Sequence, residues 1–181
     1  MCMIERRQGG ETGVKHVQAV RGDEIWKAER AGRWSRELFQ AALDTMPPKD
    51  CGDLDRDLRE QAPFYLFEHQ DGLKSCVAMA NGVSKHFGFA AKLKGRDKPV
   101  ATWYELELDK PFGHFAHLLR ALERMFQTGK PAYPVERTLL STGMLDEVMH
   151  SLAEEGRPAK TPHLQIAYQP ADWTYANDPR D

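Results

Sequence analysis

The alternation of apolar and polar residues is most regular in the last third of the chain, where it predicts a long helix. Residues 134–156 open with a proline and close at Gly156, residue types that commonly start and stop a helix. In its second half the apolar side chains share one side of the helix: Met144, Leu145, Val148, Met149 and Leu152. Leu139 and Leu140 lie off this stripe, so we expect the first half to be covered on more than one side.

A second amphipathic helix is predicted from about residue 111 to residue 128, with Gly129 as its stop. Its apolar stripe is Phe115, Leu118, Leu119, Leu122, Met125 and Phe126. Two shorter helices are predicted near residues 23–31 and 35–45, with Asp23 and Ser35 as N-cap candidates. Residues 1–7 look like the end of a helix that begins further upstream. The mixed charges of residues 50–60 favour an exposed loop or a frayed turn.

The middle of the chain alternates with a period of two and predicts four strands, at residues 63–70, 73–81, 86–94 and 100–108. Asp71-Gly72 between the first two strands is a strong hairpin signal, because type I′ turns need a positive φ. Short connections favour an antiparallel meander with one exposed face. Further strands are predicted at residues 14–20 and 163–169.

These elements predict the α+β class, with a mostly antiparallel open sheet and helices packed on one face. We expect residues 14–169 to form one substrate-binding and oligomerisation domain. Residues 1–13 would be the end of a truncated helix and a loop, and residues 170–181 a loose tail.

Composition narrows the function mainly by exclusion. The 25 Lys and Arg against 27 Asp and Glu leave no basic excess, so no nucleic-acid partner is indicated. No apolar run approaches the roughly 18 residues of a membrane span, and the N-terminal residues lack the apolar core of a signal peptide. Cys2, Cys51 and Cys76 are not closely paired, which suits a reducing cytoplasm. We therefore expect a cytoplasmic protein without a membrane partner.

Familiar catalytic motifs are absent from the chain: it has no G-x-G-x-x-G, G-x-x-x-x-G-K-[ST], G-x-S-x-G or H-E-x-x-H. His114 and His117 are three residues apart on a predicted helix, a spacing that can hold a metal. Because no third ligand accompanies them, a structural role is favoured and no metal site is expected.

Four residues are candidates for substrate binding, namely Glu11, Thr12, Arg137 and His163. Glu11 and Thr12 follow two glycines and could contact a small ligand, although a loop with a capping carboxylate is the favoured explanation. Arg137 could form a buried or interfacial ion pair with Glu136, or both could lie in a solvated first helical turn. His163 stands at a strand entrance, as a ligand contact or an ordinary turn residue. No catalytic residue is predicted.

The order of elements in the last third resembles the C-terminal half of the glucose–fructose oxidoreductase and inositol dehydrogenase (Gfo/Idh/MocA) family. The long helix ends in SLAEEGR (residues 151–157), close to the family's small-residue and Gly-Arg ending, and GVKHVQAV (13–20) is similar to the first strand of its second domain. CMIERRQGGETGVK (2–15) and KPAYPVERTLLSTGMLDEVMHS (130–151) look like an uncharacterised branch.

The resemblance implies an oxidoreductase function, and it also implies that the Rossmann domain of the family is missing from this chain. In the family a preceding Rossmann domain carries the glycine-rich loop, and the catalytic lysine and histidine lie upstream of the region matched here. The chain would thus be the substrate-binding and oligomerisation half of an NAD(P)-dependent oxidoreductase acting on a sugar or polyol. It would bind no cofactor alone, with NAD or NADP held by a full-length parent. Implied partners are a Rossmann half or subunit, a second copy through the sheet, and a small-molecule substrate.

Two other hypotheses stand beside this one. The first is a non-catalytic binding or scaffold module that dimerises through the sheet face. The second is a small metal enzyme that uses His114 and His117.

Overall fold

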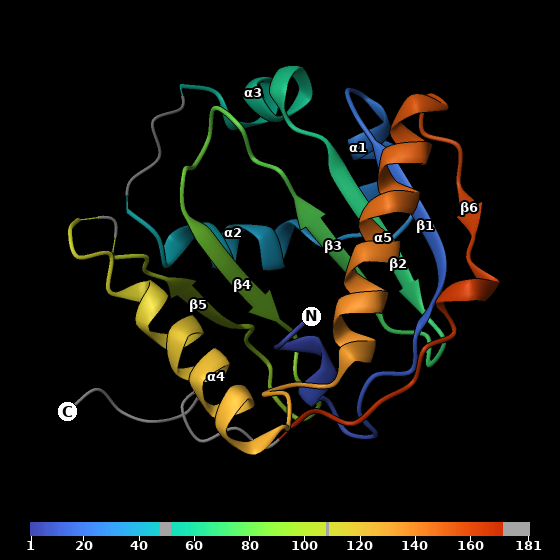
Figure 1. Cartoon of the computed structure of the whole chain (residues 1–181). Helices are drawn as coiled ribbons and strands as arrows, with labels where there is room; N and C mark the ends of the chain where they lie inside the picture. The colour runs from blue at the N-terminus through green and yellow to red at the C-terminus, as the bar shows by residue number, and fades with distance from the viewer. Residues whose placement is uncertain (48–51, 108, 172–181) are drawn as a thin grey trace.

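The computed structural model describes residues 1–47, 52–107 and 109–171, and it confirms the α+β class (Figure 1). A four-stranded antiparallel sheet has the order β3-β2-β1-β6, and a separate two-stranded sheet pairs β4 with β5. The strands are β1 (Val14–Val20), β2 (Phe64–His69), β3 (Lys74–Ala78), β4 (Phe87–Ala91), β5 (Val100–Tyr104) and β6 (Ala159–Lys160). Residues 172–181, most of the expected loose tail, lie outside the described residues, as do residues 48–51 and 108.

The predicted four-strand meander is wrong, because two hairpins form instead. The β2–β3 hairpin turns at Asp71-Gly72 as expected, with Gly72 at a φ of 84°. After β3 the chain leaves the sheet and turns into the core, where Val83 is buried with only 1% of its surface exposed. The β4–β5 hairpin lies against a short helix, α2 (Arg36–Asp44), and a Cβ at Gly88 would come within 2.1 Å of Met46 Cε.

The long helix α5 (Val135–Ala153) packs against β1, close to its predicted bounds. Its buried residues are Leu140, Met144, Val148 and Ser151. The predicted stripe was therefore partly wrong: Leu140 is fully buried, while Leu145 and Met149 are more than half exposed. At Gly143 a Cβ would lie 2.5 Å from Leu164 Cδ2, so this position allows a close approach of the C-terminal segment.

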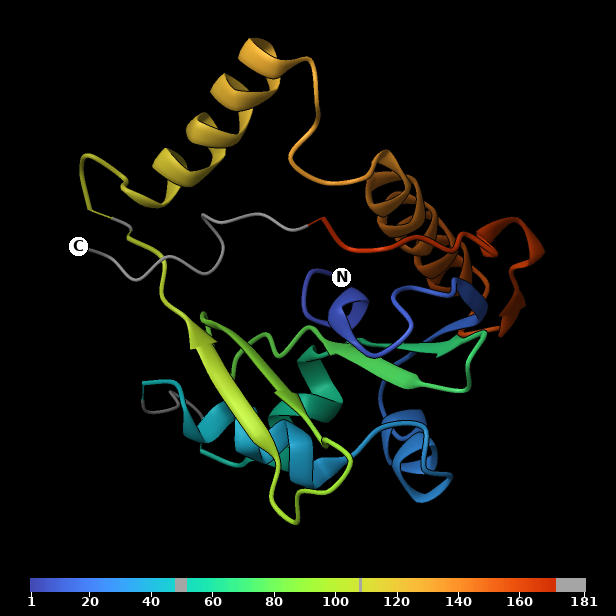
Figure 2. The same ribbon diagram turned by 90° about the horizontal axis from the view of Figure 1, so that it is seen from below.

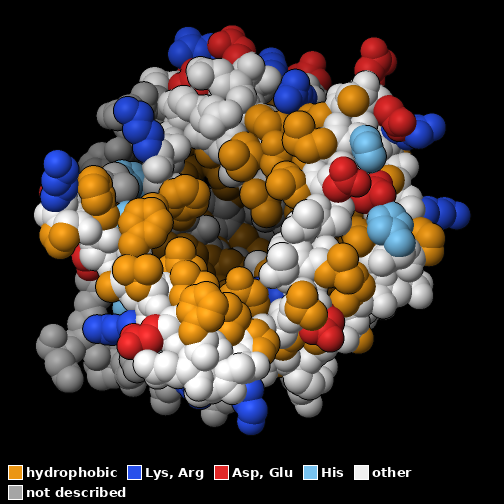
Figure 3. All heavy atoms as spheres, viewed as in Figure 1, with side chains coloured by type: hydrophobic (Ala, Val, Ile, Leu, Met, Phe, Trp, Pro, Cys, Tyr) orange, Lys and Arg blue, Asp and Glu red, His pale blue; other side chains and the backbone are white. Residues whose placement is uncertain are grey.

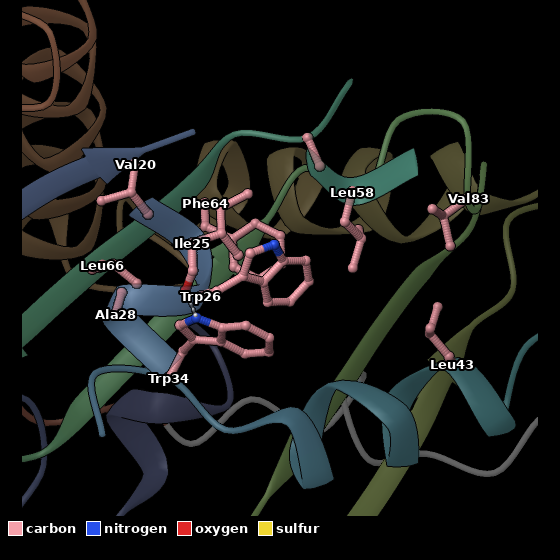
Figure 4. Packing of buried hydrophobic residues seen from close by; sticks show 11 residues of the cluster. Val20, Ile25, Trp26, Ala28, Trp34, Leu43, Leu58, Phe64, Leu66 and Val83 are labelled. Atoms are coloured by element: carbon pink, nitrogen blue, oxygen red, sulfur yellow. Dashed lines mark hydrogen bonds between the residues drawn. The ribbon is translucent and has the colours of Figure 1, made fainter. Parts of the chain in front are cut away.

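Three short helices form a core on the other side of the sheet: α1 (Glu24–Arg30), α2 and α3 (Leu54–Gln61). Figure 4 shows Trp26 and Trp34 at its centre, and the Trp34 indole N–H donates to the Ile25 carbonyl at 2.8 Å. Cys76 packs against this core, and burial raises the pKa of its thiol to about 12. Helices thus lie on both sides of the sheet, with α5 alone on its side.

The helix starts were predicted with mixed success. Ser35 caps α2 by accepting from the Leu38 N–H at 3.2 Å, but Asp23 makes no capping hydrogen bond to α1. Helix α3 stands where a loop was expected. Asp53 caps it by accepting from the Arg56 N–H, and Leu58 anchors it in the core. The charges that suggested a loop occupy its outer surface.

The ends of the described chain also differ from expectation. Residues 1–7 contain only a single 3-10 turn, η1 (Ile4–Arg6). Instead of a strand at residues 163–169, the C-terminal segment forms a second turn, η2 (Pro162–Leu164), and an isolated antiparallel bridge between Tyr168 and Glu11. Helix α4 (His114–Thr128) has its predicted extent and stands apart from both sheets, as Figure 2 shows.

Candidate functional site

Glu11 lies at the centre of a buried polar network that joins distant parts of the sequence. Its backbone pairs with Tyr168 through two hydrogen bonds of 3.0 Å. Its side chain is buried, and Oε1 accepts from the backbone N–H groups of Thr12 and Gly13, each at 2.9 Å. Gly13 has a φ of 89°, and a Cβ there would lie 2.5 Å from the Leu164 carbonyl oxygen. The sharp turn that directs Glu11 inward thus requires glycine at position 13.

Arg7 neutralises Glu11 and links it to the β2–β3 turn. Its Nη1 and Nη2 donate to Glu11 Oε2 at 2.9 Å and Oε1 at 3.2 Å, a bidentate pair. Nη2 also donates to Thr12 Oγ1 at 3.1 Å, and Nε donates to Asp71 Oδ2 at 2.7 Å. One guanidinium therefore balances two carboxylates from separate segments.

His69 approaches the same carboxylate from β2. Its ring is fully buried, with Nδ1 3.0 Å from Glu11 Oε1 and Nε2 3.0 Å from Ser75 Oγ. Because an ionised carboxylate can only accept hydrogen bonds, the contact assigns the proton to Nδ1. In the tautomer with its proton on Nδ1 alone, Nε2 accepts from the Ser75 hydroxyl.

A second buried carboxylate, Glu5, anchors the start of α5. Arg137 donates to both Glu5 oxygens, with Nε 2.9 Å from Oε2. The Tyr168 hydroxyl donates to the same Oε2 at 2.8 Å, and the Arg137 guanidinium carbon lies 4.3 Å from the centre of the Tyr133 ring. Tyr168 thus contacts Glu5 with its side chain and Glu11 with its backbone.

These contacts shift the ionisation of the network. Burial alone would raise the pKa of the Glu11 carboxyl, but hydrogen bonds from His69, Arg7 and Gly13 outweigh it and hold that pKa far below its usual range. At Asp71, burial is likewise outweighed by Arg7 and the Leu73 N–H, which lower the pKa. Burial and the bond to Glu5 raise the pKa of Tyr168. Glu11 and Asp71 are therefore ionised near neutral pH, and the Tyr168 phenol is neutral.

The structure brings three of the four predicted binding residues into this network. Glu11 and Thr12 belong to it directly, and Arg137 belongs to it through Glu5 rather than the expected Glu136. His163 lies apart, 55% exposed, with Nε2 3.2 Å from Glu147 Oε1. Contact of any of the four with a substrate stays a prediction.

Sequence reasoning missed Glu5, Arg7, His69, Ser75 and Tyr168. One signal was present for two of them: His69 and Ser75 flank the Asp71-Gly72 turn at positions that a hairpin brings together on one face. Arg7 lies four residues before Glu11, a local spacing that was also available. Glu5 and Tyr168 meet their partners only through contacts between segments more than 130 residues apart, which no local pattern indicates.

Metal binding finds no support in the described part of the chain. No group of three or more His, Cys, Asp or Glu side chains there is arranged to hold a metal ion. His114 is occupied as a helix-end contact, with Nδ1 2.8 Å from the Glu107 carbonyl oxygen. The structural role favoured for His114 agrees with this contact.

A second feature is an open apolar side, which Figure 3 shows as a hollow surrounded by hydrophobic side chains. Its exposed apolar residues on β3 and just after it, on α4 and on α5 are Val77, Met79, Phe115, Leu118, Leu119, Leu122, Phe126, Val135, Leu139, Leu145 and Met149. Along the whole of α4 only Ala121 is buried. Exposed apolar side chains gathered around a hollow mark a site of interaction with another molecule.

Comparison with known protein families, with curated proteins and with solved structures finds no match to this chain. The polar network and the open apolar side are therefore the two features from which function has to be argued.

Proposed function

We propose that the chain is the substrate-binding and assembly half of an NAD(P)-dependent oxidoreductase acting on a sugar or polyol. A separate nucleotide-binding half would cover the open apolar side. The observation that carries the proposal is α4, a helix of 15 residues whose apolar stripe faces solvent. The resemblance of residues 2–15 and 130–151 to the Gfo/Idh/MocA family supplies the chemistry.

The exposure of α4 is too large for a helix that needs no partner. Phe115, Leu118 and Leu119 are more than half exposed, and Phe126 is 79% exposed. Full burial of each such side chain is worth about 1.5–3 kcal/mol. An amphipathic helix gains most of its stability from packing of its apolar face, so a partner surface over α4 would stabilise both the helix and the assembly.

The glycine-rich segment of this chain does not fit a dinucleotide. Gly9, Gly10 and Gly13 surround Glu11, and the N–H groups of Thr12 and Gly13 already donate to its carboxylate. A pyrophosphate needs such N–H groups free, and a neighbouring carboxylate repels it. The nicotinamide cofactor would therefore be held by the other half, and this chain would supply a wall of the substrate pocket.

The test combines assembly with cofactor binding. The native species in cells that express the chain is expected to exceed 20.6 kDa and to include a polypeptide with a G-x-G-x-x-G loop. The isolated chain is expected to leave NADH fluorescence unchanged in a titration to millimolar concentration. Tight, stoichiometric NADH binding by the isolated chain would contradict the proposal.

A second candidate is a non-catalytic module that dimerises through the sheet face. Val77 and Met79, which are 48% and 42% exposed at the outer strand, favour it. Light scattering would then give twice the 20.6 kDa monomer mass without any other polypeptide. A monomer at high micromolar concentration would contradict this candidate.

The cellular location belongs to the same proposal. No helix in the described ranges is long and apolar enough to cross a membrane. Cys2 and Cys76 are free thiols, which suits the cytoplasm that we propose.

A further inference from the structure

Ser75, His69 and Glu11 form a continuous series of hydrogen bonds. Ser75 Oγ lies 3.0 Å from His69 Nε2, and His69 Nδ1 lies 3.0 Å from Glu11 Oε1. The ring is held at both nitrogens, and the carboxylate holds the tautomer that leaves a lone pair directed at the serine. A hydroxyl, an imidazole and an orienting carboxylate in this relation are the parts that activate a serine nucleophile.

The hairpin places the serine at the border between the buried network and open surface. Ser75 pairs with Phe67 across the two strands, and His69 follows Phe67 by two residues, so these side chains share one face. Val77 follows on that face and is 48% exposed, and Ser75 itself is partly exposed. Ser75 is therefore the partly exposed end of the series, while His69 is fully covered.

The same strand offers a donor for a developing oxyanion. The N–H groups of His69 and Met79 donate to Leu73 and Pro63, which puts the odd-numbered residues of β3 in the hydrogen-bonded positions. The Cys76 N–H, directly after Ser75, therefore points away from β2. Among the described strands none pairs with that outer edge.

We propose that Ser75 is an acyl-accepting nucleophile, with His69 as its base, Glu11 as the positioning residue, and esters of short apolar acids as substrates. Ser75 Oγ attacks the ester carbonyl carbon while its proton passes to His69 Nε2. The bond from the carbonyl carbon to the alcohol oxygen then breaks, and the alcohol leaves with that proton. Water cleaves the acyl-serine in the same way and regenerates Ser75. Val77 and Met79 supply the apolar surface beside the acyl group.

This activity is independent of the proposed nicotinamide chemistry, because it needs only the residues of this chain. The test uses the full chain with a fluorophosphonate probe, followed by intact mass and peptide mapping, and with p-nitrophenyl butyrate as substrate. We expect one adduct, on Ser75, formed at least about 100-fold faster than on other serines, as general-base assistance typically provides. Ser75→Ala should abolish both the adduct and the ester hydrolysis.

Two variants separate activation from simple exposure. His69→Asn should slow labelling of Ser75 about 100-fold or more. Ser84 is partly exposed like Ser75, but its hydroxyl donates to Met46 Sδ at 3.4 Å and accepts from the backbone N–H of His86 at 3.1 Å rather than meeting a buried imidazole ring, so Ser84→Ala should change nothing. Circular dichroism and a cooperative melt establish that each protein is folded. A folded wild-type chain in which Ser75 reacts no faster than Ser84 would overturn the proposal, as would a folded His69→Asn variant with unchanged labelling.

Discussion

Arg7 illustrates how single residues hold the beginning of the described chain in place. Its side chain is only 17% exposed, and its guanidinium contacts Glu11 and Asp71 together. Both are anions whose charge Arg7 compensates, and the Glu11 side chain has no exposure to water of its own. Removal of the cation would leave Glu11 as a buried charge balanced only by neutral donors.

Arg7→Met should therefore lower the free energy of unfolding by about 3 kcal/mol, within the range measured when one partner of a buried pair is removed. Chemical denaturation at pH 7 measures the change. Arg6→Met is the matched control, because Arg6 is the exposed neighbour in the same turn and should stay within about 0.5 kcal/mol of wild type. Equal effects at the two positions would contradict the argument.

The pKa shifts of the network predict the pH range of stability. Glu11 and Asp71 have lowered pKa values in the folded chain, so their contribution is present at neutral pH and is lost as the pH falls below about 4.5. Tyr168 has a raised pKa, so stability should also fall as the pH rises above about 10. Urea midpoints measured from pH 3 to pH 11 check both limits. Asp71→Asn should show a weaker acid dependence than wild type, and an unchanged slope would exclude Asp71 as a contributor.

At the scale of elements, α5 and the C-terminal segment meet at Gly143. A glycine-to-alanine change inside a helix normally stabilises it by about 0.5–1 kcal/mol. Here the new Cβ would lie 2.5 Å from Leu164 Cδ2, in a buried contact. Overpacking of this kind costs about 1–3 kcal/mol.

Gly143→Ala should thus destabilise the protein by about 1 kcal/mol, although helix propensity alone predicts that the change is stabilising. The same change in a Leu164→Ala background should be stabilising, because the clash is gone. Thermal melts of the four proteins form the cycle that measures this coupling. A Gly143→Ala effect of the same sign in both backgrounds would mean that Leu164 does not limit the position.

Helix α4 carries the prediction about assembly. Leu119→Gln with Phe126→Gln replaces two side chains that are 63% and 79% exposed, so the isolated chain should keep its fold. Its affinity for the proposed nucleotide-binding half should fall at least about 30-fold, since the lost burial of two large side chains exceeds about 2 kcal/mol. Arg124→Gln, which leaves the apolar stripe intact, is the control. Pull-down from cells that express the full assembly measures the loss.

Elements were predictable from sequence in proportion to how much of their stability is local. Helix α4 and the β2–β3 hairpin carry complete signals, a seven-residue apolar repeat and an Asp-Gly turn, and both were found. Helix α3 was missed because Leu54 and Leu58 are its only large apolar residues, and the rest of the helix is polar or charged. These two leucines stabilise the helix by packing into the core, a contact that the local sequence does not indicate. The buried face of α5 differs from the predicted one because it includes Ser151, a polar residue. The Ser151 hydroxyl accepts from the Ala19 N–H and donates to the Arg157 carbonyl.

At the scale of the whole molecule, the four-strand meander was predicted wrongly and the polar network was predicted only in part, for a common reason. Both depend on which segments the chain brings together over long separations. Glu11 and Arg137 stood out by their local context, but their partners His69 and Glu5 are assigned only once β2 and α5 are placed. The apolar stripe of α4, which forms part of the open apolar side, was predicted from the sequence. The sequence did not indicate that this stripe stays exposed in the folded chain.

Cys76 gives this architecture a built-in chemical reporter. Cys76 lies on β3 and packs against the helical core, and this burial raises the pKa of its thiol to about 12. It should therefore react with iodoacetamide only when the β2–β3 hairpin detaches from that core. Exposed Cys2 would be modified at once and mark the start of the reaction, with Cys51 replaced by serine. The alkylation rate of Cys76 then measures the frequency of local opening of the β2–β3 hairpin, without a denaturant or a spectroscopic label.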